Sequence, residues 1–157
     1  MPEFDGLTSF RKSGYQRMRD AEHLLSPPIG NSNERGSSGR HLRGAEYLCG
    51  YGVECLLKAY LISLHAPLQR LSQVLIELRE KDSKVRDICG SAGHDLNYLW
   101  QLAELEYELD AKLAAQKNLL SKWSSNWRYS PEPSNEKEAK ARVRAARDLV
   151  EWINSRM

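Results

Sequence analysis

The sequence predicts an all-α protein, and three observations support this fold class. No stretch combines apolar–polar alternation with β-branched enrichment, whereas Leu, Ala, Glu, Lys and Arg dominate the chain. Apolar residues recur three or four positions apart through most of the sequence. Proline and glycine clusters separate these periodic segments. We therefore expect one all-helical domain over residues 1–157, with five helices and no internal repeat.

The first helix is expected over about 7–25, with Asp5 or Thr8 as its N-cap. The two prolines at 27–28 end it. The segment 26–39 follows, in which eleven of fourteen residues are Ser, Pro, Gly or Asn. This composition predicts a mobile surface loop.

The second helix, about 40–65, is apolar around nearly its whole circumference. A helix of this kind is buried by several neighbours, so we expect it at the centre of the bundle. Gly50 and Gly52 are then explained as small residues that let another helix approach closely. Glu54 and Lys58 stand one turn apart and can form an ion pair.

A third helix is expected after Pro67, with one leucine face formed by Leu68, Leu71, Leu75 and Leu78. Gly90 and Gly93 break the chain after it. If that leucine face is exposed, it would form a homodimer or bind a partner, and substitutions at Leu71 or Leu75 would then break the dimer.

Two further helices complete the bundle. Asp95 is the predicted N-cap of the fourth, which continues through Trp123 with a bend near Asp110. Asn135 and Glu138 have the spacing of a capping box and start the last helix.

Charge and cysteine content restrict the class of protein. The net charge of +2 does not suggest a histone-like binder of nucleic acids. No stretch without a charged residue, such as 59–69, is long enough to span a membrane, and the N-terminus does not resemble a secretory signal. We therefore expect a cytoplasmic protein. Cys49, Cys55 and Cys89 are an odd number without a C-x-x-C pair, and we expect buried, reduced thiols rather than a disulfide or a metal site.

His94 is the histidine with the most informative context. It follows the flexible segment 90–93 and immediately precedes Asp95 at a predicted helix start. One interpretation is structural, in which these side chains cap the helix and satisfy the loop backbone. The other is proton transfer or contact with a phosphate group.

A second candidate cluster lies before the proline-containing segment near residue 131. Trp123, Trp127 and Tyr129 surround Arg128, and an arginine among aromatic rings can stack on bases or bind a phosphate. The alternative is that the tryptophans close the core while the arginine binds backbone carbonyls. No glycine-rich phosphate loop, metal-ligand pair or nucleophile motif accompanies either cluster, and no cofactor is predicted.

Three segments resemble the HEPN family. The pattern V-E-x-x-L-K-A of its signature helix is matched by Val53, Glu54, Leu57, Lys58 and Ala59. The run 93–96 followed by Leu99 is similar to the family's G-H-D-L-x-x-L, and Arg128-Tyr129 before Pro131 is similar to its R-Y-P. The three segments occur in the family's order, and the resemblance covers about 10–153.

The resemblance implies a four- to five-helix, mainly up-and-down bundle that often forms homodimers. Such proteins are associated with nucleotides or RNA in prokaryotic toxin–antitoxin and defence systems. Many members are metal-independent ribonucleases with an arginine and a histidine separated by four to six residues. Here the bare pattern occurs as Arg17 with His23 and Arg35 with His41, outside the family's usual place, while seven residues separate Arg86 from His94.

We therefore expect a HEPN-like nucleotide- or RNA-associated module in such a system, with a nucleotidyltransferase-type antitoxin as a possible partner. Candidate ligand-binding residues are Lys58, Arg86, Asp95 and Tyr129. One alternative is a metal-independent RNA endonuclease in which His94 is the general acid or base and Arg128 or Arg86 stabilises phosphate. Another is a non-catalytic helical adaptor.

Overall fold

A computed structural model describes residues 5–26, 38–129 and 135–157, and within these ranges the protein is all-helical, with no strand. An isolated β-bridge joins Gly6 to Arg70. The helices, in chain order, are α1 (Leu7–Leu25), α2 (Ser38–Leu64), α3 (Leu71–Lys81), η1 (Ser91–His94), α4 (Leu96–Ala103), η2 (Leu105–Glu108), α5 (Ala111–Leu119), η3 (Ser125–Tyr129) and α6 (Glu136–Ser155). The expected mobile loop lies almost entirely outside the described residues.

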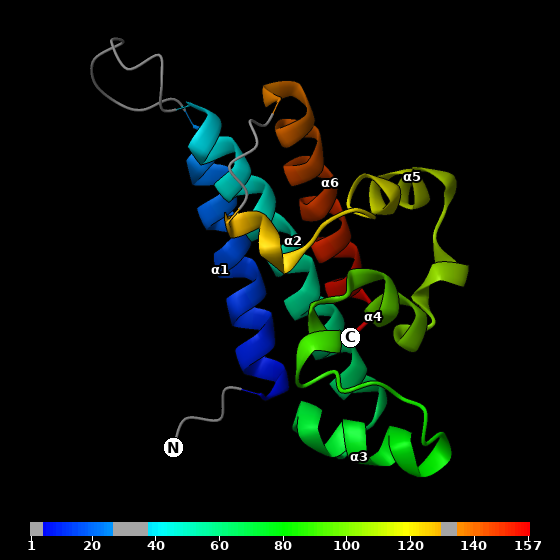
Figure 1. Ribbon diagram of the computed structural model, residues 1–157. Helices are drawn as coiled ribbons and strands as arrows, with labels where there is room; N and C mark the ends of the chain where they lie inside the picture. Colours follow the sequence, from blue (N-terminus) through cyan, green and yellow to red (C-terminus); the bar gives the residue numbers. More distant parts are fainter. Residues whose placement is uncertain (1–4, 27–37, 130–134) are drawn as a thin grey trace.

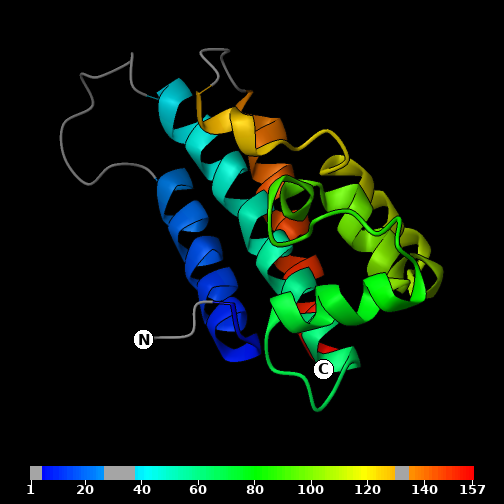
Figure 2. The same cartoon turned by 60° about the horizontal axis from the view of Figure 1, so that its bottom comes forward.

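The three long helices α1, α2 and α6 lie side by side, with α1 antiparallel to the other two (Figure 1). The shorter helices α3, α4 and α5 pack around the lower and right-hand sides of this group (Figures 1 and 2). One hydrophobic core includes residues from all of the long helices and from α3 and α4.

The prediction that α2 lies at the centre is confirmed. Val53, Leu56, Leu57 and Leu61 are completely buried, and α2 contacts α1, α3, α4, α6 and two of the 3₁₀ helices. Within the described residues, 41–64 is the one segment long and apolar enough to cross a membrane, but 72% of its most apolar window is buried inside the protein. These are the surroundings of a core helix.

Close helix approach at the α2 glycines is also confirmed. A Cβ atom at Gly52 would lie 3.0 Å from the sulfur of Met18 on α1 and 3.2 Å from the carbonyl oxygen of Gly14. A Cβ atom at Gly50 would lie 2.1–2.4 Å from atoms of the Trp123 indole. Real Cβ atoms do not approach other atoms so closely, so Gly50 lets the indole lie directly against the helix backbone.

The expected first N-cap is wrong. Gly6 occupies the N-cap position of α1, and no side chain caps the helix. Asp5 interacts instead with the start of α3, where its carboxylate accepts a hydrogen bond from the Ser72 hydroxyl and its backbone oxygen accepts one from the Leu71 amide. Asp5 therefore joins the beginning of α1 to α3.

The fourth helix differs most from the prediction. It ends at Ala103, because Glu104 adopts a left-handed conformation with φ of 55°. After η2, Asp110 starts α5 by accepting a hydrogen bond from the Leu113 amide. The bend expected near Asp110 is thus a complete break, which gives six α-helices in the described residues rather than five.

Two other predicted caps are present. The Asp95 carboxylate accepts a hydrogen bond from the Tyr98 amide at the start of α4. Asn135 accepts hydrogen bonds from the amides of Lys137 and Glu138 at the start of α6.

Two expectations about exposure are wrong. Leu71 and Leu75 are 2% and 8% exposed because they pack into the protein's own core, so this face of α3 is not a free surface for a partner. Cys89 is exposed in the segment between α3 and η1, whereas Cys49 and Cys55 are buried as expected. Burial, with the charge of Glu54 as a smaller cause, raises the pKa of the Cys55 thiol to about 12.

Candidate functional site

Two glutamates on α2 are buried: Glu46 is completely inaccessible to solvent, and Glu54 is 1% exposed. Carboxylates are almost never buried in this way unless cations or hydrogen-bond donors compensate their charge. The two positions are eight residues apart, and each is the centre of its own polar network. The two networks differ in their access to solvent.

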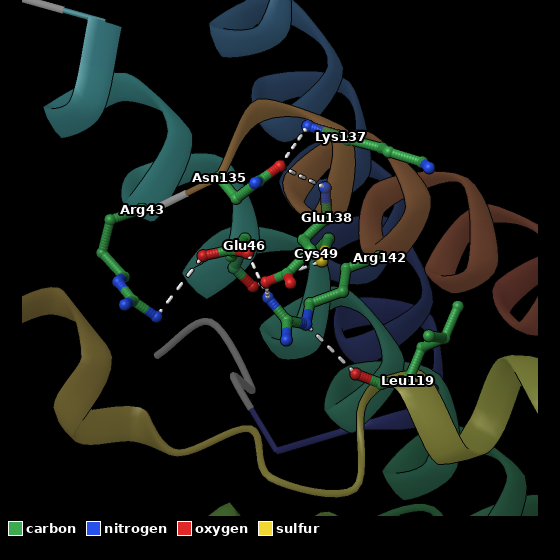
Figure 3. A network of polar contacts seen from close by, with 8 residues as sticks. All are labelled: Arg43, Glu46, Cys49, Leu119, Asn135, Lys137, Glu138 and Arg142. Carbon is green, nitrogen blue, oxygen red and sulfur yellow. Dashed lines mark hydrogen bonds and ion pairs between the residues drawn. The ribbon is translucent and has the colours of Figure 1, made fainter. Parts of the chain in front are cut away.

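The network around Glu46 joins α2 to α6 and to the end of α5 (Figure 3). Arg142 of α6 donates a hydrogen bond to Glu46 at 2.5 Å, and its Nε donates to the carbonyl of Leu119 at 3.3 Å. Arg43 lies 3.4 Å from the second oxygen of Glu46. The Trp127 ring lies 4.7 Å from the Arg43 guanidinium carbon and 5.5 Å from that of Arg142. Arg142 also lies 3.7 Å from the exposed Glu138. All of these contacts are between side chains and backbone of the protein itself, so the network holds helices together.

The network around Glu54 reaches the surface. Its Oε1 accepts a hydrogen bond from Lys58 Nζ at 2.6 Å, which confirms the pair predicted from the sequence. Its Oε2 lies 3.1 Å from Nδ1 of His94 at the end of η1. The Lys58 side chain is 9% exposed, but the His94 side chain is 44% exposed. A buried ion pair is therefore linked to one imidazole that contacts solvent.

Local sequence explains how these three side chains meet. Glu54 and Lys58 lie one turn apart on α2, and the loop before α4 passes directly against them. A Cβ atom at Gly93 would lie 2.1 Å from the carbonyl oxygen of Ile88 and 3.0 Å from Lys58 Nζ. Glycine at position 93 thus lets the loop pass close to Lys58 and places His94 beside Glu54.

A second ion pair adjoins His94 in the sequence. Arg86 donates to Asp95 at 3.0 Å, and its guanidinium carbon lies 4.7 Å from the centre of the Tyr98 ring. The Arg86 amide also donates to the Tyr98 hydroxyl at 2.8 Å. Both charged side chains are substantially exposed, 54% for Arg86 and 39% for Asp95.

The four charged side chains around His94 balance one another. Glu54 and Asp95 supply two negative charges, and Lys58 and Arg86 supply two positive charges. A positive charge on the imidazole would therefore be in excess and would lie at the surface.

The contact with Glu54 also selects the tautomer of His94. An ionised carboxylate can only accept a hydrogen bond, so the His94 Nδ1–H must donate. A neutral imidazole then keeps its lone pair on Nε2. This arrangement can accept a proton through Nε2, or donate one to an anion after protonation.

The structure brings together four of the six residues selected from the sequence. Lys58 and His94 share Glu54 as a partner, and Asp95 and Arg86 are paired beside them. Within the described residues, no group of three or more His, Cys, Asp and Glu side chains could hold a metal ion.

Arg128 and Tyr129 belong to a different part of the surface. They lie on η3, which packs against α2. Just before η3, Trp123 donates a hydrogen bond to the carbonyl of Tyr47, in an earlier turn of α2 than Lys58. Tyr47 and Lys58 are separated by roughly 16 Å along the helix axis at ~1.5 Å per residue. The Arg128 guanidinium carbon lies 4.4 Å from the centre of the Tyr129 ring, and both residues are exposed.

Sequence reasoning did not select Glu54 as a site residue. Its spacing from Lys58 indicated an ion pair, but the contact with His94 joins residues forty positions apart. The position of Glu54 in the apolar part of α2 could have indicated this contact, because a buried glutamate needs partners that compensate its charge.

Searches against protein-family models, curated proteins and solved structures gave no match to this chain. The geometry of the Glu54, Lys58 and His94 cluster is therefore the main basis for a functional hypothesis.

Proposed function

We propose that this protein is a HEPN-like module that binds a nucleotide or RNA, with a phosphate group of the ligand contacting His94. The observation that supports this most is the half-exposed imidazole held against a buried, lysine-paired glutamate. The resemblance of the segments around Lys58 and His94 to the HEPN motifs points to the same pair of residues.

The charges around His94 fit an anionic ligand. Lys58 neutralises Glu54, so that a protonated imidazole is left with excess positive charge at the surface. Arg86 is exposed and can exchange Asp95 for a phosphate oxygen, since guanidinium groups bind phosphate in the same bidentate way as carboxylate.

Binding assays test this proposal. The full chain is titrated into labelled adenosine nucleotides and short RNA, alongside His94→Ala and His23→Ala, which removes an exposed histidine of α1. We expect His94→Ala to weaken binding and His23→Ala to have no effect. If the wild type binds none of these ligands, or if His94→Ala binds as well as the wild type, the proposal is wrong.

A metal-independent endoribonuclease is the second candidate, and the Glu54–His94 hydrogen bond favours it. With Nδ1–H donated to Glu54, Nε2 can remove the proton from a ribose 2′-hydroxyl, whose oxygen then attacks the adjacent phosphorus. The P–O5′ bond breaks, one fragment ends in a 2′,3′-cyclic phosphate, and the protonated Nε2 gives its proton to the leaving 5′-oxygen. Arg86 is the nearest candidate to stabilise the charge on phosphate, and Arg128 would have to act from another part of the surface.

RNA cleavage in EDTA distinguishes an enzyme from a binding module. Wild type and His94→Ala are purified identically, so that contaminating nuclease would appear in both. Cleavage by the wild type alone would establish a ribonuclease. Equal cleavage by both, or none by either, would contradict the enzymatic candidate.

The biological setting follows from the resemblance. We propose a cytoplasmic protein of a prokaryotic toxin–antitoxin or defence system, forming a homodimer and pairing with a nucleotidyltransferase-type antitoxin. Light scattering of the purified chain tests the homodimer. A growth defect on expression, relieved by a neighbouring gene, tests the toxin role, and normal growth would count against it.

A further inference from the structure

One stripe of α2 extends from the Glu54 cluster toward η3 and contains two tyrosines. At ~100° per residue, Tyr51, Glu54 and Lys58 lie about 40°, −20° and 20° around the helix axis from Tyr47. All four therefore lie on one face, within an arc of about 60°. Glu46, which faces α6, lies about 100° away from Tyr47.

The aromatic rings of this stripe form a row with an indole from the segment before η3. The rings of Tyr47 and Tyr51 have centroids 6.2 Å apart and planes 13° from parallel. Tyr47 and Trp123 have the same centroid separation, with planes 20° apart. Three nearly parallel rings thus follow one another across α2, and we call Trp123, Tyr47 and Tyr51 the ring row.

The ring row is fixed at one end and partly exposed at the other. Trp123 is fixed because its Nε1 donates to the carbonyl of Tyr47 at 3.1 Å and its ring lies against Gly50. Trp123 is 6% exposed, whereas Tyr47 and Tyr51 pack against the core and are partly buried. The two tyrosine side chains are therefore held in place and keep part of their surface in contact with solvent.

Cations are present at the Tyr51 end of the ring row. The Arg17 guanidinium carbon lies 5.6 Å from the centre of the Tyr51 ring, and its side chain is 43% exposed. Its ion pair with Asp20 is long, at 3.6 Å. One turn further along α2, Glu54 leads to the half-exposed His94. Two groups that can contact phosphate thus lie close to the accessible rings.

We propose that the ring row is a stacking surface for the bases of a single-stranded nucleic acid, whose phosphates contact Arg17 and His94. This inference rests on the proposed function and extends it from an unspecified nucleotide or RNA to an unpaired strand. Partly exposed, nearly parallel aromatic rings beside groups that can contact phosphate are a combination that binds single strands, because every base has a flat face that can stack.

The proposal makes a clear distinction among ligands. In a duplex the bases are already stacked on one another, so a duplex cannot use the rings. A mononucleotide can occupy only one ring. We therefore expect a single strand of several nucleotides to bind more tightly than either a duplex of the same sequence or a mononucleotide.

Fluorescence anisotropy with a labelled oligonucleotide tests the role of Tyr51. The full chain is titrated into RNA and DNA single strands of one sequence and into the corresponding duplex. If one base stacks on the Tyr51 ring, we expect Tyr51→Leu to lower the affinity at least about fivefold. Tyr51→Phe, which keeps the ring, should bind within about twofold of the wild type. The control Tyr107→Leu removes a tyrosine that is 90% exposed on η2 and should have no effect.

Each result has a distinct meaning. If no nucleic acid binds to the wild type, the proposed function and this inference both fail. If binding is sensitive to His94→Ala but Tyr51→Leu binds normally, or if the duplex binds as well as the single strand, only this inference fails. Equal binding of RNA and DNA would agree with stacking, since the rings do not contact the sugar.

A second measurement does not depend on the folding of a variant. The wild-type chain is photo-crosslinked to a single strand containing 4-thiouridine, and the crosslinked peptide is identified by mass spectrometry. We expect crosslinks at Tyr47 or Tyr51. Crosslinks found only on other elements would overturn the proposal.

Discussion

Replacing Glu54 alone should destabilise the protein much more than replacing Glu54 and Lys58 together. Both side chains are nearly inaccessible, at 1% and 9% exposure, and their charged atoms are 2.6 Å apart. In Glu54→Leu, the Lys58 ammonium would lose its carboxylate partner and keep its contact with the Phe10 ring, whose centroid is 5.7 Å away. Removing one partner of a buried pair typically costs about 3–5 kcal/mol, because the other charge is left uncompensated.

In the double variant, Glu54→Leu with Lys58→Met, neither charge is buried. Replacement of a buried ion pair by apolar side chains of similar volume is often neutral or stabilising. His94 loses its partner in both variants, but its side chain is half-exposed and water can accept the Nδ1–H hydrogen bond. We therefore expect the double variant to recover at least about 2 kcal/mol of the loss in the single variant.

Urea unfolding followed by circular dichroism measures these free energies. A control cycle on the exposed pair Glu136–Lys140, with charged atoms 2.6 Å apart, should give a coupling energy much smaller than that of Glu54–Lys58, because water screens exposed charges. If the losses in Glu54→Leu and Lys58→Met simply add in the double variant, the assignment of a compensating buried pair is refuted.

Three other predictions concern packing, a helix cap and thiol reactivity. Gly50→Ala should lower the free energy of unfolding by about 1–3 kcal/mol in urea titrations, because the new methyl group overlaps the Trp123 indole. The control Gly44→Ala, whose new Cβ atom has its nearest contact at 3.3 Å, should be neutral or slightly stabilising. Asp110→Ala should cost ~1 kcal/mol in the same assay by removing the cap of α5, and an unchanged midpoint would argue against the cap. In the native protein, a maleimide should modify Cys89 and neither of the other two cysteines. Partial burial of the thiol and the nearby charge of Asp87 raise the pKa of Cys89. Its modification should therefore be slower than that of a free thiol at pH 8 and should accelerate as the pH rises. Modification of all three cysteines at equal rates would show that the core opens.

Local chemistry predicted the features of the fold that depend on few neighbours. Asp95 and Asn135 were identifiable as caps because a short polar side chain before an apolar periodic segment satisfies free backbone amides. The position of α2 followed from its composition, because an apolar surface on all sides requires neighbours on all sides. The close approach of neighbouring elements at Gly50 and Gly52 followed from the same argument, because a buried helix needs small residues where neighbours pack tightly.

Features that depend on long-range packing could not be predicted in this way. The break after α4 occurs at Glu104, a residue type with no preference for the left-handed conformation, where Leu105 becomes completely buried. The exposure of Cys89 depends on the path of the segment between α3 and η1, which its sequence does not define.

The candidate site was predictable only in part, for a similar reason. Lys58 was selected because its segment resembles a HEPN motif. His94 was selected because it follows the segment 90–93 and precedes a predicted helix start, and its segment also resembles a HEPN motif. The carboxylate that joins them, and the separate position of Arg128 on η3, depend on how the loop before α4 packs against α2.

The helix α5 has no buried residue, and this has a consequence for the motions of the protein. Some of its side chains are partly buried, and two of them contact one carboxylate of α6: Gln116 donates a hydrogen bond to Asp148, and Lys112 forms an ion pair with it. A segment with so little buried surface can unfold locally while the rest stays native. In native-state hydrogen exchange, the amides of α5 should exchange through such a local opening, at a rate nearly independent of global stability. The amides of α2 around Leu57 should exchange only when the whole domain unfolds.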